Sequence, residues 1–160
     1  MSTAHNFPAI EEGLAAIEAR IPHRPPFLLL DRIVEEDEKR IVCQWRVPED
    51  ADWFRGHYPG QPILPGVLLS EHTFQSAACL ISKALTGFAE DDGVPVLTKI
   101  ESARFKRIIR PGETVETTCK VRERLGPAWY MSAQVTCEAQ TALKNQFVLS
   151  ATNAMQRVGA

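Results

Sequence analysis

The sequence has no long hydrophobic run, no excess of positive charge and no repeated unit. No stretch approaches the roughly 20 consecutive apolar residues of a membrane-spanning helix, and the first residues, acidic at Glu11 and Glu12, do not resemble a secretory signal. The 160 residues carry 18 basic and 20 acidic side chains, so they provide no general positive field for nucleic acid. We therefore expect a cytoplasmic protein that binds neither nucleic acid nor a membrane.

Cysteine and histidine are also sparse, and neither is spaced as a metal or redox motif. The cysteines lie far apart in apolar segments and form no CxxC pair, which favours reduced, buried thiols. The histidines lack the paired spacing of a metal ligand set, so we expect no metal and no cofactor. The residues concerned are Cys43, Cys79, Cys119, Cys137, His5, His23, His57 and His72.

The first half of the chain predicts a short helix, two strands and a long buried helix. Apolar residues recur at helical spacing over 10–21, 27–34 is a mostly apolar strand, and alternation over 40–47 marks a half-buried strand. After a loop over 48–62, the segment from 66 to about 85 has only two formal charges and is apolar on nearly every side of a helical wheel. A helix of this kind is usually buried.

The second half predicts four consecutive strands joined by short turns. Consecutive strands with a single long helix imply an antiparallel sheet curled around that helix, which is an α+β domain. We expect an N-terminal helical segment over 1–20 and one domain over 21–160. The strands are expected within 94–109, 113–124, 128–140 and 145–158, with turns at Pro111-Gly112, Gly126-Pro127 and Lys144-Asn145.

Residues 57–71, HYPGQPILPGVLLSE, combine a helix start with two titratable side chains. Pro65 and Gly66 suit the first turn of the long helix, where free N–H groups and the helix dipole can hold a carbonyl oxygen that gains negative charge. Glu71 lies about 7.5 Å further along the helix axis. Apolar surroundings disfavour an ionised carboxylate and so favour Glu71 as a proton donor, with His57 as the complementary base.

These residues alone do not select a reaction. A loop histidine and a helical glutamate are most often ordinary structural or solvated residues. The choice comes from a resemblance carried by three segments in order: IPHRPPFLLLDRI over 21–33, GHYPGQPILPGVLLSEHTFQ over 56–75 and SARFKRIIRPGETV over 102–115. Together they resemble the FabZ-type 3-hydroxyacyl-[acyl-carrier-protein] dehydratases over roughly residues 21–157. The fold that this resemblance implies is the hot-dog fold, an antiparallel sheet wrapped around a long central helix.

The resemblance also implies the roles of individual residues in a hydro-lyase reaction of fatty acid biosynthesis. His57 would remove the α-proton of a (3R)-3-hydroxyacyl thioester, and Glu71 would assist departure of the 3-hydroxyl as water, giving a trans-2-enoyl thioester. The Gly66 N–H would bind the thioester carbonyl. Gln75 would have a supporting polar role, or else a purely structural hydrogen bond.

Family members build this site across a homodimer, often within a trimer of dimers, and line an apolar tunnel for the acyl chain. The candidates for the tunnel wall, each of which could instead be a core residue, are Ile63, Leu64, Phe74 and Phe88. The family usually has E-A-M-A-Q where this chain has EHTFQ over 71–75, which leaves its acyl-chain preference open. Adjacent helical residues diverge by about 100°, so we expect His72 to serve packing or an interface.

Basic residues are concentrated in the strands that follow the central helix. It is either a solvated strand face or a docking surface for an acidic acyl carrier protein and its phosphopantetheine phosphate. The candidate docking residues are Arg104, Lys106 and Arg107, with Arg110, Arg122 and Arg124 nearby.

Three other functions remain open at this stage. A hot-dog acyl thioesterase would use a helical carboxylate and release a free thiol, but would not need His57. A non-catalytic acyl-binding module would bind thioesters without turnover, and retention of both His57 and Glu71 argues against it. A paralogous polyketide-type dehydratase would share the chemistry and differ only in pathway.

Overall fold

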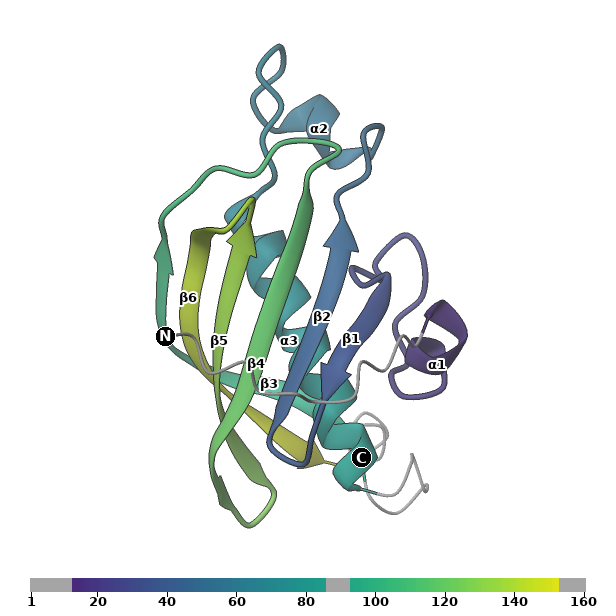
Figure 1. Ribbon diagram of the computed structural model, residues 1–160, viewed down its shortest axis with the longest axis vertical. Helices are drawn as coiled ribbons and strands as arrows, with labels where there is room; N and C mark the ends of the chain where they lie inside the picture. Colours follow the sequence, from purple (N-terminus) through teal and green to yellow (C-terminus); the bar gives the residue numbers. More distant parts are fainter. Residues whose placement is uncertain (1–12, 86–92, 153–160) are drawn as a thin grey trace, which may run out of the picture.

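Residues 13–85 and 93–152 are described by a computed structural model, in which one sheet surrounds one long helix (Figure 1). Three helices and six strands lie within these residues. In chain order they are α1 (Leu14–Glu18), β1 (Arg32–Glu36), β2 (Arg40–Arg46), α2 (Trp53–Gly56), α3 (Gly66–Ala84), β3 (Val94–Phe105), β4 (Thr114–Leu125), β5 (Ala128–Cys137) and β6 (Gln140–Thr152).

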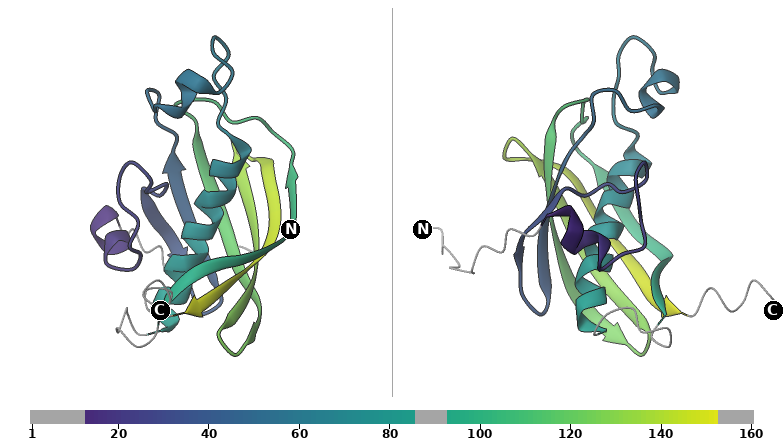
Figure 2. Two further views of the ribbon diagram at one scale, coloured as in Figure 1. Left: turned by 180° about the vertical axis from the view of Figure 1, so that it is seen from behind. Right: turned by 90° about the vertical axis from the view of Figure 1, so that its right-hand side faces the viewer.

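The sheet has the strand order β1-β2-β4-β5-β6-β3, and every neighbouring pair is antiparallel. It curves around α3, which lies against its inner face (Figure 2). This confirms the predicted α+β architecture of a sheet wrapped around a long central helix. β3 lies at one edge of the sheet, with β6 as its neighbour.

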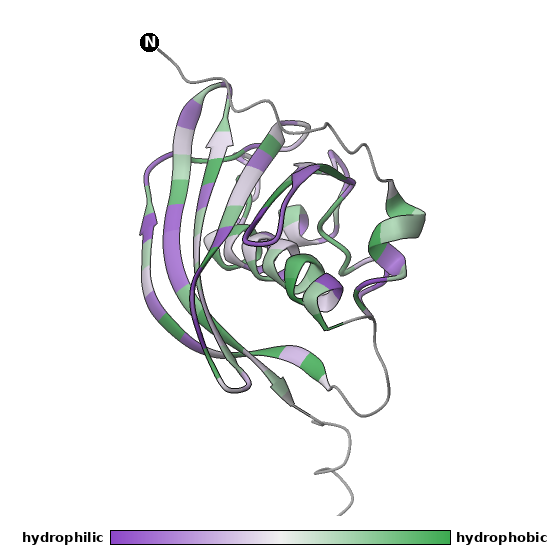
Figure 3. Ribbon diagram, turned by 60° about the horizontal axis from the view of Figure 1, so that its bottom comes forward, coloured by the Kyte–Doolittle hydropathy of each residue, from purple (hydrophilic) through white to green (hydrophobic). Residues whose placement is uncertain are grey.

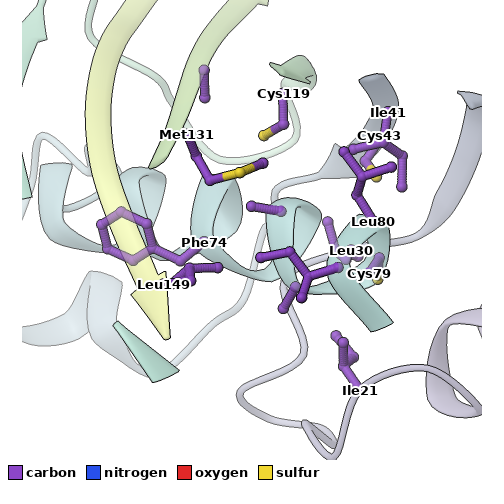
Figure 4. Close-up of a cluster of buried hydrophobic side chains, with 14 of the residues drawn as sticks. Ile21, Leu30, Ile41, Cys43, Phe74, Cys79, Leu80, Cys119, Met131 and Leu149 are labelled. Atoms are coloured by element: carbon purple, nitrogen blue, oxygen red, sulfur yellow. The ribbon is translucent and has the colours of Figure 1, made fainter. Parts of the chain in front are cut away.

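The inner face of the sheet is apolar because strand side chains alternate between the helix and the solvent. Polar and apolar bands along the strands are visible in Figure 3. Met131 on β5 and Phe147 on β6 are fully buried against α3, where Phe74 and Leu80 join the same cluster (Figure 4). Ile17 of α1 also lies in this cluster. The division of the chain at residue 20 stays a prediction.

The four cysteines are buried and form no disulfide within the described residues, as their apolar positions predict. Cys43, Cys79 and Cys119 lie in the cluster around α3. Burial raises the pKa of Cys43 to about 12, which makes its reactive thiolate form scarce at neutral pH. No helix within the described ranges is long and apolar enough to cross a membrane.

α3 is buried as predicted, but it is less apolar than its helical wheel indicates. Its buried residues include several with hydroxyl, amide or imidazole groups, and the side chains of four of them form hydrogen bonds within the protein: His72, Thr73, Gln75 and Ser76. Asn145 of β6 donates to the Thr73 hydroxyl at 2.8 Å, and that hydroxyl donates to the Ser70 carbonyl at 2.6 Å. Such bonds satisfy polar groups that would otherwise be costly to bury. The buried polar residues of α3 are Ser70, His72, Thr73, Gln75, Ser76 and Ser82.

Two local predictions are wrong. The expected turn at Lys144-Asn145 lies inside β6, and the chain instead reverses at Glu138-Ala139, whose φ angles of 50° and 62° are left-handed. A tight two-residue hairpin needs such angles, and tertiary pairing of β5 with β6 imposes them on residues that give no turn signal. The loop over 48–62 also contains a helix, α2, which is too short to show a periodic pattern.

Candidate active site

His57 follows α2 and is fixed by the turn after it. Its Nδ1 lies 2.9 Å from the carbonyl oxygen of Ile63, and its ring meets the edge of the Tyr58 ring at a centroid distance of 4.8 Å. Because a carbonyl oxygen only accepts hydrogen bonds, Nδ1 carries the proton that is donated. In the neutral ring Nε2 then has the free lone pair, which is the form a general base requires.

The turn holds its shape through two left-handed positions. Tyr58 has φ 53° and Gly60 has φ 86°, and the Gln61 N–H donates to the Tyr58 carbonyl at 3.0 Å. The segment then joins the sheet, where the Leu64 N–H donates to the Ile109 carbonyl at 2.7 Å. The loop that carries His57 is thereby tied to the start of α3.

Gly66 begins α3, and the ring of Phe105 packs over it. A Cβ at residue 66 would lie 3.0 Å from Cε1 of Phe105, so a larger residue would make this ring shift by a few tenths of an ångström. The N–H groups of Leu68 and Leu69 donate to the Pro65 carbonyl, whereas the Gly66 N–H has no backbone acceptor in the part of the chain that the structure describes. The helix start therefore retains a donor of the kind that binds developing negative charge.

Glu71 lies one and a half turns further along α3, in more polar surroundings than the sequence predicts. Its Oε1 accepts a hydrogen bond from Gln75 Nε2 at 3.0 Å and lies 3.5 Å from His23 Nε2. Its side chain is 23% exposed. The prediction that Glu71 has apolar surroundings is therefore wrong, because the segment before β1 places the His23 imidazole against the helix.

Gln75 uses all its polar atoms and connects Glu71 to that preceding segment. Its Oε1 accepts from the Leu29 N–H at 2.8 Å, and its Nε2 donates to the Phe27 carbonyl at 2.9 Å as well as to Glu71. These three bonds also fix the orientation of the amide. The structural hydrogen bonds considered for Gln75 are therefore present, and its supporting role in the reaction stays a prediction.

His72 points away from Glu71 into the core. Its Nδ1 donates to the Leu29 carbonyl at 2.7 Å, its ring stacks on Trp45 at 5.6 Å, and its Nε2 is buried without a partner. Burial lowers the pKa of His72 to about 4, partly opposed by the bond to Leu29. His72 is thus a neutral packing residue, in agreement with its predicted role.

The structure does not join His57 to Glu71 within one chain. Among the described residues no hydrogen bond or ion pair links them: His57 contacts Ile63 and Tyr58, and Glu71 contacts His23 and Gln75. His23 is the neighbour of Glu71 that the sequence reasoning missed. Its signal in the sequence is its place in the segment over 21–33, which resembles a family motif.

The expected tunnel residues lie mostly in the core. Phe74 is buried edge-to-face against Phe147 at 4.7 Å, and Leu64 is buried in a second cluster with Trp45 and Ile109. Ile63 is half-buried beside His57. Phe88 falls outside the described residues, so a tunnel role for any of these four stays a prediction.

The expected docking residues differ in whether they already form ion pairs within the chain. Arg107 bonds to Glu113 and Glu138, each at 2.9 Å, whereas Arg104 and Lys106 are exposed. Arg104 also lines a cavity of about 720 Å³ on the outer face of the sheet, away from α3. Three further cations, Arg40, Lys120 and Lys144, and no carboxylate line that cavity.

Known proteins resemble this chain in sequence. It is 35% identical over 147 residues to a 3-hydroxyacyl-[acyl-carrier-protein] dehydratase FabZ of Anaeromyxobacter sp. (strain K), covering 91% of this chain and 93% of the relative. The chain belongs to the FabZ family of dehydratases. FabZ of Rickettsia akari (strain Hartford) is 38% identical over 128 residues, 79% of this chain and 87% of the relative. A family model described as ApeI-like, ApeI dehydratase, matches residues 33–144 of this FabZ-type chain.

Solved structures share the fold of this FabZ-type chain. The dehydratase heterocomplex ApeI:P from Xenorhabdus doucetiae superposes with a TM-score of 0.74 at 14% identity, covering 90% of this chain and 97% of the other. The E. coli PaaI protein superposes with a TM-score of 0.57 at 17% identity, covering 74% and 80%. At these identities the likeness shows the hot-dog fold alone.

Proposed function

We propose that this chain converts (3R)-3-hydroxyacyl-[acyl-carrier-protein] thioesters to trans-2-enoyl thioesters and water in fatty acid biosynthesis. The names of the FabZ relatives support the substrate class. The structural observation that supports the reaction most is the bond between His57 and the Ile63 carbonyl. It directs the proton of a neutral imidazole to Nδ1 and leaves Nε2 as a base.

In the proposed reaction, each group acts on a different atom of the substrate. His57 Nε2 takes a proton from C2 while the Gly66 N–H stabilises the enolate-like charge on the thioester oxygen. Glu71 gives a proton to the 3-hydroxyl as the C3–O bond breaks, so that the hydroxyl leaves as water, and the electron pair of the broken C2–H bond forms the C2–C3 double bond. The proton that His57 takes from C2 offsets the proton that Glu71 gives, so the reaction consumes no net proton. Gln75 supports Glu71 through its bond to Oε1.

We further propose a homodimer in which His57 of one protomer works with Glu71 of the other. Within one chain the two side chains have separate contacts, and the β3 edge carries exposed apolar residues such as Val96, Leu97 and Ile100. Exposed apolar strand edges favour association. A trimer of dimers and a cytoplasmic location stay predictions of the sequence.

The test follows enoyl-thioester absorbance with 3-hydroxyacyl substrates of several lengths. His57→Ala and Glu71→Gln should each lower kcat by roughly 100-fold or more, the usual contribution of general acid–base groups. Glu123→Gln, on β4, is a matched control with the same chemical change as the glutamate variant. Undiminished turnover in both site variants would refute the assignment, and release of free thiol without enoyl product would identify a thioesterase instead.

A second test concerns the carrier protein, which we propose docks at Arg104 and Lys106. Arg104→Glu with Lys106→Glu should raise the KM for a carrier-linked substrate by about 10-fold and leave a short soluble thioester unaffected, because only the carrier presents an acidic surface. Lys39→Glu, at the β1–β2 turn, is a control that reverses one charge outside the cavity that Arg104 lines. Equal effects on both substrates would disprove docking at these residues.

A further inference from the structure

His23 lies in the segment between α1 and β1, and this segment is fastened to α3 beside Glu71. Gln75 holds the backbone at Phe27 and Leu29, and His72 holds the Leu29 carbonyl. At the same end, His23 Nε2 lies 3.5 Å from Glu71 Oε1, with the two side chains 26% and 23% exposed. The imidazole therefore meets the carboxylate at a partly dry position.

The surroundings of His23 select one form of its ring. Its Nδ1 is buried and has no hydrogen-bond partner among residues 13–85 and 93–152. A proton on Nδ1 would leave a buried N–H unsatisfied, which is costly, so the neutral ring carries its proton on Nε2. That N–H is the one beside Glu71. At 3.5 Å the contact is long for a hydrogen bond, but bonds at catalytic sites commonly tighten when substrate binds.

The two donors near Glu71 meet the same oxygen. Gln75 Nε2 donates to Oε1 at 3.0 Å, and His23 Nε2 approaches that atom too, while no partner is recorded for Oε2 among the described residues. A carboxylate held through one oxygen is fixed in orientation and keeps the second oxygen for another ligand.

We propose that His23 is a positioning residue for dehydration. Together with Gln75 it holds Oε1 of Glu71, so that Oε2 is the atom that meets the 3-hydroxyl of the substrate. This inference rests on the proposed function. His23 touches Glu71 and not the reacting atoms, so its loss should slow the chemical step without weakening substrate binding.

The backbone around His23 is held by hydrogen bonds that do not involve the His23 side chain. Substitution of His23 can therefore test its role without moving the loop. Arg24 donates to the carbonyls of Ile21 and His23 and, through Nη2, to that of Glu18, at 2.7–2.9 Å. The His23 ring itself packs on Phe27 at a centroid distance of 6.5 Å. A ring of similar shape at residue 23 should therefore leave the backbone in place.

The kinetic test compares two variants that differ in their ability to donate. His23→Phe keeps a ring but has no N–H, and should lower kcat at least about 10-fold with KM within twofold of wild type, as expected for a lost bond to a charged group. His23→Gln keeps an N–H at the position of Nε2 and should retain most of kcat. Phe27→Leu removes the ring contact, keeps the donor and should change kcat little.

An equal fall of kcat in both His23 variants, or none in either, would overturn the proposal. Thermal midpoints are measured alongside, and His23→Leu replaces His23→Phe if the latter does not fold. A readout independent of activity is the ¹⁵N spectrum of histidine-labelled protein, where His23 should show the Nε2–H tautomer at neutral pH. An Nδ1–H tautomer would exclude the proposed donor even if dehydration is established, whereas absence of wild-type turnover would instead refute the function.

Discussion

At the scale of single residues, the three described histidines show how the same side chain acquires different properties. His57 has a donor fixed toward a backbone carbonyl and a free Nε2, His23 faces a carboxylate, and His72 is enclosed in the core. The sequence distinguishes His57 by its motif. It could not assign His23, because the neighbour of that ring is set by the docking of the segment over 19–31 against α3.

The buried state of His72 predicts a dependence of stability on pH. An unfolded histidine titrates near 6.5, whereas burial lowers the pKa of His72 to about 4 in the folded chain. Between these values the unfolded state binds a proton that the folded state does not. Stability is therefore unaffected by this group above pH 6.5 and falls by roughly 3 kcal/mol in total as the pH drops to about 4.

His72→Asn tests this dependence, because the asparagine amide can replace the Nδ1 donor to Leu29 without titrating. Between pH 7 and pH 5 the free energy of unfolding of the wild type should fall by about 2 kcal/mol more than that of the variant. Urea unfolding at a series of pH values measures the difference, and contributions of other titrating groups cancel between the two proteins. Parallel pH profiles would contradict the assignment.

At the scale of elements, one carboxylate joins three parts of the chain. Glu36 at the end of β1 has a fully buried side chain, and its two oxygens bond to Arg20 after α1 at 2.8 Å and Lys83 near the end of α3 at 3.0 Å. Because the carboxylate is dry and both partners lie far away in sequence, Glu36 fixes how α1 and α3 meet the sheet. The sequence did not predict this role, because the strand was expected over 27–34 and Glu36 lies beyond its end.

Glu36→Ala should lower the free energy of unfolding by about 3 kcal/mol, the usual effect of removing one partner from a buried charge cluster. Glu35→Ala is the matched control, because the neighbouring Glu35 pairs with Arg40 at 2.9 Å but is 35% exposed. Exposed pairs contribute about 1 kcal/mol or less. Urea denaturation compares the two variants. Similar decreases in the free energy of unfolding would show that the ion pairs of Glu36 stabilise the protein no more than that of Glu35.

The elements themselves were largely predictable. α3 begins at Gly66 as expected and ends at Ala84, because a long apolar segment bounded by Pro65 leaves little alternative. The hairpin at Glu138-Ala139 was not predictable, since neither residue favours left-handed angles and only the pairing of β5 with β6 determines the turn. Local chemistry decides the first case and distant pairing the second.

At the scale of the whole molecule, exposed apolar residues gather along β3 and beside the start of α3. Ile100 and Phe105 on β3 are each 51% exposed, and Val67 on α3 is 76% exposed. The proposed homodimer would bury these residues against a partner protomer. The sequence alone could indicate the dimer only through the family resemblance, because the β3 pattern reads equally well as an internal strand.

Ile100→Lys should convert the proposed dimer to monomers and abolish turnover, because the charge would be buried at the interface. Sedimentation velocity and the dehydratase assay measure the two effects together. Leu125→Lys is the control, since Leu125 is 54% exposed on β4. An active monomer would rule out a shared site.

Mixing subunits tests the same arrangement without disturbing the interface. After random, equal mixing of His57→Ala and Glu71→Gln subunits, half the dimers are mixed and each has one intact site of two, so about a quarter of wild-type activity should return. Sites contained within single chains would regain none.

The pairing of β3 also bears on how the protein is made. β3 is translated before β4 and β5, yet its partner is β6, with Val94 opposite Thr152 and Phe105 opposite Leu143. On a ribosome that synthesises from the N-terminus, β3 must wait until β6 emerges before it can join the sheet. The edge that we propose joins two protomers would therefore form last. During synthesis, nascent chains would have no completed sheet edge through which to pair with one another.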